Sequence, residues 1–169
     1  DKIIKQKQKL IDTNAEEIKS RVEEKSMLEQ ENTNLLNEIT DRLQTEKKQE
    51  KLKQIRATLS EKLTSHEKMT TFFTDNEDCP TCEQHIDETF KEGMLVKNNK
   101  SIDKLEDGLS KLKTELDNVY DRAGEIKKTT KMIADNQVSL AKINTSIKEL
   151  EKFNVKLQTE IDQYSKDSA

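Results

Sequence analysis

The stretch that decides the fold is DNEDCPTCEQHID, residues 75–87, which lies near the middle of a 169-residue chain. It contains both cysteines, the single proline and one of the two histidines. On either side, residues 1–74 and 88–169 are dominated by Lys, Glu, Gln, Leu and Ile. The chain therefore places its one chemically unusual stretch between two long polar segments.

The composition of the chain excludes an ordinary globular domain. Only 31% of the residues are hydrophobic, 38% are charged, and there are three glycines, one proline and no tryptophan. Such a polar chain either stays disordered or buries a narrow apolar stripe along a long helix. Heavy use of Lys, Glu, Leu and Gln with few helix breakers favours the helix.

The charge pattern and the cysteine count limit the partners and the compartment. The net charge is −4, with 30 basic and 34 acidic residues intermixed, so we expect no direct DNA contact from this segment. There is no apolar run that could span a membrane and no secretory signal. Two cysteines are too few for a disulfide scaffold, so we expect a reducing, cytoplasmic setting. Because the chain opens on Asp1 without Met, we expect it to be part of a larger protein.

Apolar residues after the cysteines recur at steps of three, four or seven positions, which is typical of a coiled-coil helix. They are Ile102, Leu105, Leu109, Leu112, Leu116, Val119, Ala123, Ile126, Ile133, Leu140, Ile143, Ile147, Leu150, Leu157, Ile161 and Tyr164. The first half has a weaker version of the pattern. Its apolar residues are Ile4, Ile11, Ala15, Ile18, Val22, Leu36, Ile39, Leu43, Leu52, Ile55, Leu59 and Leu63.

The two halves mirror each other about the cysteines, which predicts that they pair antiparallel within one chain. Residues equally distant from the centre match in type: Leu52 with Leu109, Leu43 with Val119, Leu36 with Ile126, and Asn32 with Thr130. The sequence therefore predicts an all-α fold, a long intramolecular antiparallel coiled-coil hairpin. Its parts are an ascending arm (1–74), an apex (75–86) and a descending arm (87–169). The alternative is that the two segments form separate helices, each of which pairs with a helix of another chain.

The ends of the two arms carry further signals. Asp87 is a plausible N-cap for the second arm. An apolar plug is expected where the arms meet the apex, made of Phe72, Phe73, Ile86, Phe90 and Met94. A polar stretch at 25–37, facing 124–140, is expected to let the arms bend, because polar core positions forfeit much of the burial that joins two helices.

Cys79-Pro80-Thr81-Cys82 is the motif that carries chemistry. The C-x-x-C spacing lets two sulfurs of one turn reach a single Zn²⁺, and Pro80 restricts the turn. A catalytic dithiol would need a strand–helix–strand context, which this chain lacks. An intrachain site would need further ligands, for which His85, Asp87 and the more distant His66 are the candidates. A disulfide within one chain also stays open.

The remaining possibility is that one chain supplies half of a metal site. A structural Zn²⁺ takes four ligands, and two thiolates from each of two apices would complete a Cys₄ set. The two chains would then be related by a two-fold axis, the commonest arrangement in homo-oligomers. We therefore expect Cys79 and Cys82 to be the metal ligands, with one zinc per two chains.

A long helix, C-P-x-C and a returning helix together resemble the zinc hook of the SbcC-type SMC-like ATPases of DNA double-strand-break repair. The resemblance rests on Cys79-Pro80-Thr81-Cys82 and on HIDETF, residues 85–90. The sequence around this motif is most similar to that of the T-even bacteriophage members. It covers about fifteen residues; the rest matches only as generic coiled coil. Glu83 departs from the family, which often has Gly after the second cysteine.

The resemblance implies that this segment is part of a larger protein assembly. It implies ATPase head domains beyond both ends of the chain, a nuclease subunit near the heads, and DNA held by the heads. It also implies a hook that joins two ATPase molecules through Cys79 and Cys82, in the cytoplasm of a host cell if a phage encodes the protein. No G-x-x-x-x-G-K motif occurs here, so we expect no enzyme activity from this segment itself.

Overall fold

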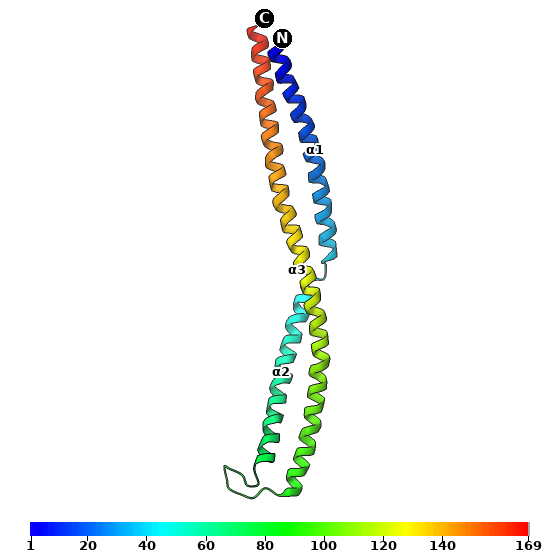
Figure 1. The fold of residues 1–169 in the computed structure, drawn as a ribbon, viewed down its shortest axis with the longest axis vertical. Helices are drawn as coiled ribbons and strands as arrows, with labels where there is room; N and C mark the ends of the chain where they lie inside the picture. Colours follow the sequence, from blue (N-terminus) through cyan, green and yellow to red (C-terminus); the bar gives the residue numbers. More distant parts are fainter. Residues whose placement is uncertain (169) are drawn as a thin grey trace. The chain divides into compact units, whose positions relative to one another are not determined.

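The computed structural model describes residues 1–168 and confirms an all-α fold. Its helices are α1 (Lys2–Glu38), α2 (Arg42–Asp75) and α3 (Glu88–Asp167) (Figure 1). Within the described residues the only extended pairing is an isolated antiparallel bridge between Asp78 and His85. The three glycines all lie within α3, and the single proline lies in the turn between α2 and α3. None of them interrupts a helix.

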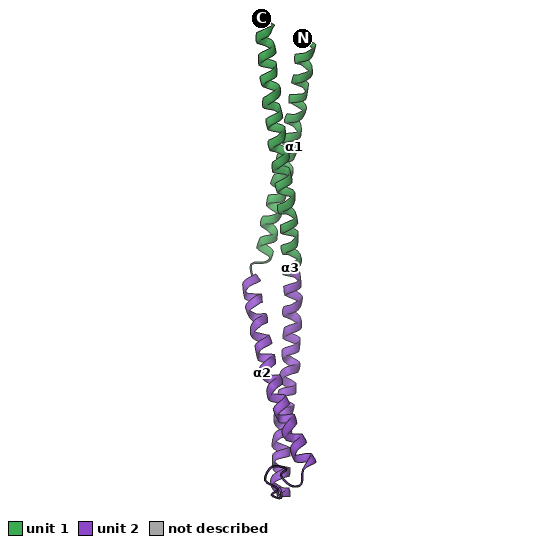
Figure 2. Ribbon diagram, turned by 90° about the vertical axis from the view of Figure 1, so that its left-hand side faces the viewer, with its two compact units in different colours: residues 1–40, 126–169 green, residues 41–125 purple. Residues whose placement is uncertain are grey.

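The chain divides into two compact units (Figure 2). Unit 1 comprises Asp1–Thr40 and Ile126–Ala169, in which α1 packs antiparallel to the C-terminal part of α3. Unit 2 comprises Asp41–Glu125, in which α2 packs antiparallel to the N-terminal part of α3, with the apex joining them. Both units are thus two-helix arrangements, as the mirrored sequence pattern predicts.

The predicted stripe on α3 is confirmed, since all of its residues are buried or half-buried. Leu116 is the most enclosed, at 2% exposure, and packs with Leu52, Leu112 and Val119 in unit 2. Leu35, Ile39, Ile126 and Ile133 form the corresponding cluster in unit 1. A narrow stripe of this kind is what a coiled-coil packing requires.

The predicted stripe on the first half is partly wrong. Leu36 and Leu43 are 56% and 68% exposed, and their expected partners Ile126 and Val119 pack elsewhere. The core positions of α1 follow a strict heptad that includes many polar side chains. They are Ile4, Lys7, Ile11, Asn14, Ile18, Arg21, Lys25, Leu28, Asn32, Leu35 and Ile39. A pattern based on apolar residues alone therefore loses the heptad register wherever a core position is polar.

Two pairs of asparagines set the register of unit 1. Asn14 Nδ2 donates to Asn154 Oδ1 (2.9 Å), and Asn154 Nδ2 donates to the Ile11 carbonyl (3.3 Å). The second pair repeats the motif with the helices exchanged. Its bonds run from Asn136 Nδ2 to Asn32 Oδ1 (2.9 Å) and from Asn32 Nδ2 to the Ile133 carbonyl (3.5 Å). Asn32 therefore faces Asn136, not Thr130, and its amide both donates to and accepts from α3.

The first arm is interrupted between Glu38 and Arg42, instead of running unbroken to residue 74. The heptad accounts for this. Every seventh residue is buried or half-buried from Ile4 to Ile39 and again from Thr45 to Phe73, but Ile39 and Thr45 are one residue too close. A continuous helix would turn the core face by about 100° at this point. The interruption lies outside 25–37, where α1 is unbroken, and α3 runs unbroken through 124–140.

Candidate functional site

The apex is a narrow two-stranded turn between α2 and α3. Ile86 N donates to the Glu77 carbonyl (2.9 Å), and Cys79 N donates to the Gln84 carbonyl (2.8 Å). These bonds flank the Asp78–His85 bridge and hold the two sides of the turn together. The turn therefore has its own frame of backbone hydrogen bonds.

The base of the turn is fixed by helix caps. Asn76 Nδ2 donates to the Phe72 carbonyl (2.8 Å) at the end of α2. At the start of α3, the Phe90 backbone N–H donates to Asp87 Oδ2 (3.1 Å), which confirms Asp87 as the N-cap. The two helices thus end at defined residues on both sides of the apex.

Glu83 closes the tip of the turn. Its backbone N–H donates to the Cys79 carbonyl (2.8 Å), and its φ of 61° lies in the left-handed region. Glycine adopts this conformation at little cost, whereas a residue with a Cβ is strained there. Glu83 therefore takes a left-handed backbone conformation at the tip although it carries a Cβ.

Cys79 and Cys82 are both free thiols at this tip. Cys79 is half-buried and Cys82 is exposed. The pKa of the Cys79 thiol is lowered from its usual value, chiefly because the backbone N–H of Cys82 donates to its sulfur, followed by that of Thr81. The turn therefore favours a thiolate, the form of cysteine that binds metal.

The other candidate ligands are engaged elsewhere in the structure. His85 Nδ1 lies 3.0 Å from Asp78 Oδ1. Asp87 caps α3. Among residues 1–168, no group of three or more His, Cys, Asp or Glu side chains is placed to hold one metal ion. As placed here, the apex of a single chain offers two sulfur donors.

His66 lies within the helix packing of unit 2, away from the apex. Its Nδ1 shares a hydrogen bond with Asn98 Oδ1. Asn98 Nδ2 in turn donates to the His66 carbonyl and to Thr70 Oγ1, both at 2.6 Å. Because Asn98 is 3% exposed and all of its polar atoms have partners, this cluster aligns α2 with α3. His66 faces Asn98 and takes part in a structural contact.

The apolar plug forms only in part. Phe73 is 8% exposed and makes edge-to-face contacts with Phe72 (centroids 5.2 Å apart) and Phe90 (6.1 Å). Ile86 and Met94 are half-buried. Phe90, however, is 57% exposed, so it joins the predicted plug only through its edge-to-face contact with Phe73. It lies in the first turn of α3, just beyond the apex.

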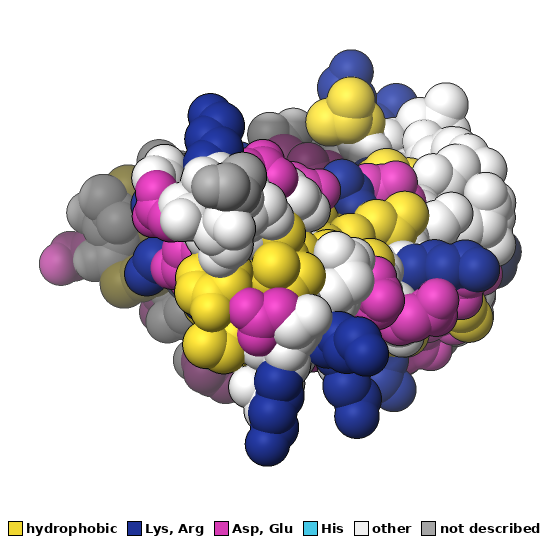
Figure 3. Space-filling view, turned by 90° about the horizontal axis from the view of Figure 1, so that it is seen from above, with side chains coloured by type: hydrophobic (Ala, Val, Ile, Leu, Met, Phe, Trp, Pro, Cys, Tyr) yellow, Lys and Arg dark blue, Asp and Glu magenta, His cyan; other side chains and the backbone are white. Residues whose placement is uncertain are grey.

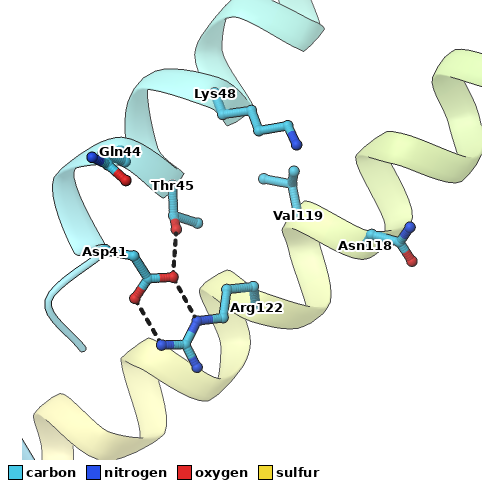
Figure 4. Close-up of a pocket in the computed structure, with 7 residues that line it drawn as sticks. All are labelled: Asp41, Gln44, Thr45, Lys48, Asn118, Val119 and Arg122. Carbon is cyan, nitrogen blue, oxygen red and sulfur yellow. Dashed lines mark hydrogen bonds and ion pairs between the residues drawn. The ribbon is translucent and has the colours of Figure 1, made fainter. Parts of the chain in front are cut away.

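A second polar site, which the sequence pattern does not predict, lies where α2 begins (Figure 4). Arg122 on α3 donates from Nε to Asp41 Oδ2 (2.9 Å) and from an Nη to Asp41 Oδ1 (2.7 Å). Thr45 Oγ1 donates weakly to the same carboxylate (3.4 Å). Asp41 therefore bonds to α3 in place of capping its own helix, and it fixes the first turn of α2.

These side chains line a hollow of about 290 Å³ together with Gln44, Lys48, Asn118 and Val119 (Figure 4). Hydrogen bonding from Arg122 lowers the pKa of Asp41 to about 2. Because the carboxylate is stabilised by folding, its contribution is present above its usual pKa of 3.8 and is lost as the pH falls through about 2. The pair is thus intact at every physiological pH.

Replacing Arg122 by Gln is expected to return the pKa of Asp41 from about 2 towards 3.8, because the largest cause of the shift is removed. An NMR titration of the Asp41 carboxyl carbon measures this directly. Arg21→Gln is the matched control, since Arg21 pairs with Glu17 within α1. An unchanged Asp41 titration in the Arg122 variant would rule out the bidentate pair.

The molecular surface carries charges of both signs. Seen from the end at which both termini lie, basic and acidic side chains are mixed, and apolar side chains are exposed towards the middle of the view (Figure 3). Among residues 1–168, no helix has an apolar stretch of the length that crosses a membrane. Comparisons of this chain with protein-family models, with curated proteins and with solved structures gave no match.

Proposed function

We propose that this chain is a zinc-mediated homodimerisation and tethering element. The observation that carries the proposal is the apex. A hydrogen-bonded turn holds Cys79 and Cys82 beyond the ends of α2 and α3, with Cys82 exposed and the pKa of Cys79 lowered. Two thiolates on a preformed turn fit a tetrahedral zinc site by chemistry, but they supply only half of its usual ligands.

A second copy of the same apex is the partner that best completes the ligand set. Cys79 and Cys82 of each copy would hold the ion, and Zn²⁺ would supply the link between two chains. The backbone N–H donors of Cys82 and Thr81 would stabilise the negative charge on the Cys79 sulfur. The apex would thereby join two molecules while the paired helices set the distance between the joint and the chain ends.

By resemblance, the larger assembly is an ATPase–nuclease complex of DNA double-strand-break repair or recombination, of the SbcC type. In that setting DNA and the nuclease subunit would bind at head domains outside this segment, and the segment itself would have no enzyme activity. The mirrored helices and the central C-P-x-C motif support this assignment. The alternative is a coiled-coil spacer with a metal site or a disulfide within one chain.

Metal stoichiometry tests the proposal. Purified chain is loaded with Zn²⁺, its molar mass is measured by light scattering with and without a chelator, and zinc is counted per chain. We expect a dimer with one zinc per two chains that becomes a monomer when the metal is removed. One zinc per chain in a monomer would instead establish an intrachain site, and a metal-free monomer would exclude the hook.

A further inference from the structure

Two neighbouring residues at the start of α3 present surface that the rest of the chain does not cover. Phe90 is 57% exposed although it is a large aromatic side chain. Gly93 lies three residues later, and a Cβ added to it would meet no atom within 4 Å. Residues three apart share one face of a helix, so Phe90 and Gly93 form a continuous patch of aromatic surface and bare backbone.

We propose that this patch, Phe90 with Gly93, is a contact surface for the same patch on a second copy of the chain. The inference rests on the proposed zinc-linked dimer and adds to it a protein contact beside the metal. A two-fold axis through a shared metal brings the same surfaces of both copies together. Phe90 of each copy would then pack against the Gly93 backbone of the other.

Gly93 supports the proposal because it leaves room for a second chain to approach the backbone of α3 closely. Within the 80-residue helix α3, glycine stabilises the helix less than alanine does. Gly108 on the same helix has a neighbour, Leu59, whose Cδ1 would lie 3.8 Å from an added Cβ. Gly93 has none in this chain. A helix surface without a Cβ lets a second body approach the backbone, and a phenyl ring fits such a flat site.

The position of Phe90 places the proposed contact next to the apex. Side chains on a helix lean towards its N-terminus, and Phe90 lies in the first turn of α3. Its edge-to-face contact with the buried Phe73 holds the ring in place, which lowers the entropy cost of binding. The ring is therefore presented on the side of the molecule where a second apex would arrive.

Charge at the apex explains why a zinc-linked dimer needs an apolar contact. Six acidic residues crowd the turn and its borders: Asp75, Glu77, Asp78, Glu83, Asp87 and Glu88. No Lys or Arg lies among them, so two apices repel each other. Burying two phenyl rings offsets part of that repulsion without adding charge.

The test compares Phe90→Ala and Gly93→Ala with the unmodified chain. The dimer dissociation constant is measured by analytical ultracentrifugation at fixed free Zn²⁺, and the melting temperature of each chain is measured with a chelator. Matched controls are Phe153→Ala, which removes a phenylalanine that is 45% exposed in unit 1, and Gly124→Ala, which removes a glycine with equally open surroundings.

We expect Phe90→Ala to weaken the zinc-linked dimer by about 10- to 100-fold. Gly93→Ala should weaken it by about fivefold or more while raising or preserving the melting temperature of the metal-free monomer. A variant that lowers the affinity of the dimer but does not lower the melting temperature of the monomer has lost a contact with the second copy and still folds normally. Both controls should leave the dimer at the affinity of the unmodified chain.

Three results would overturn the inference. If the unmodified chain dimerises with Zn²⁺ and both patch variants match it, the patch makes no contact, and the proposed function stands without it. If Phe90→Ala alone weakens the dimer, the cause is damage to the apex beside Phe73. If the unmodified chain does not dimerise with Zn²⁺ at all, the proposed function and the inference both fail.

Discussion

Replacing Cys79 and Cys82 together by serine is expected to turn a zinc-containing dimer into a helical monomer. Four thiolates around one Zn²⁺ contribute on the order of 10 kcal/mol, far more than a small apolar contact can supply. Helix content should hardly change, because α2 ends at Asp75 and α3 is capped by Asp87, and neither boundary depends on the thiols. Light scattering and circular dichroism on the same sample measure both effects.

A second variant separates the hook from an intrachain site. His85→Ala removes the nearest additional candidate ligand, which in this structure contacts Asp78. If two apices share the metal through four sulfurs, this variant should keep one zinc per two chains and remain dimeric. A cysteine-free chain that is still a dimer at micromolar concentration would show that the helices drive association, and the hook proposal would be wrong.

Apart from the antiparallel pairing, which rests on the mirrored halves, the features that the sequence predicts correctly rest on short-range patterns. The stripe on α3 is rich in Leu, Ile and Val at nearly every core position, so its period is visible without a partner. The Asp87 cap depends on one residue and the amide three positions later. The central position of the cysteines also places the apex correctly between α2 and α3.

The features that it misses depend on two segments at once. Asn14 and Asn32 look like surface residues until Asn154 and Asn136 are placed opposite them, each pair satisfying its amides in the core. The interruption before α2 follows from the six-residue step between Ile39 and Thr45. That step becomes visible only when polar core positions such as Asn32 are counted in the heptad.

The same error in register explains why the apolar pattern predicts that Leu36 and Leu43 lie in the core. Both are large and apolar, and both lie at distances from the cysteines that match a residue of the α3 stripe. In the structure the core positions are filled by Leu35 and Thr45, and the two leucines face solvent. Apolar character alone is thus a weak guide on a helix whose core is half polar.

Leu116→Ala is expected to lower the free energy of unfolding by about 2–5 kcal/mol, because it leaves a cavity in the best-packed cluster of unit 2. Leu116 is 2% exposed and packs with Leu52, Leu112 and Val119. The matched control is Leu43→Ala in the same unit, where the side chain is 68% exposed. That change should stay within about 0.5 kcal/mol, as substitutions on a surface usually do.

Urea unfolding followed by circular dichroism, with a chelator present to keep the chain monomeric, measures both variants under the same conditions. The comparison also decides between the two registers. If Leu43 packed against Val119, as the apolar pattern suggests, its truncation would create a cavity of similar cost to that at Leu116. Equal losses from the two variants would therefore contradict the heptad in which Thr45 occupies the core. A large loss at Leu116 alone requires that heptad, and with it the one-residue shift that interrupts the first arm.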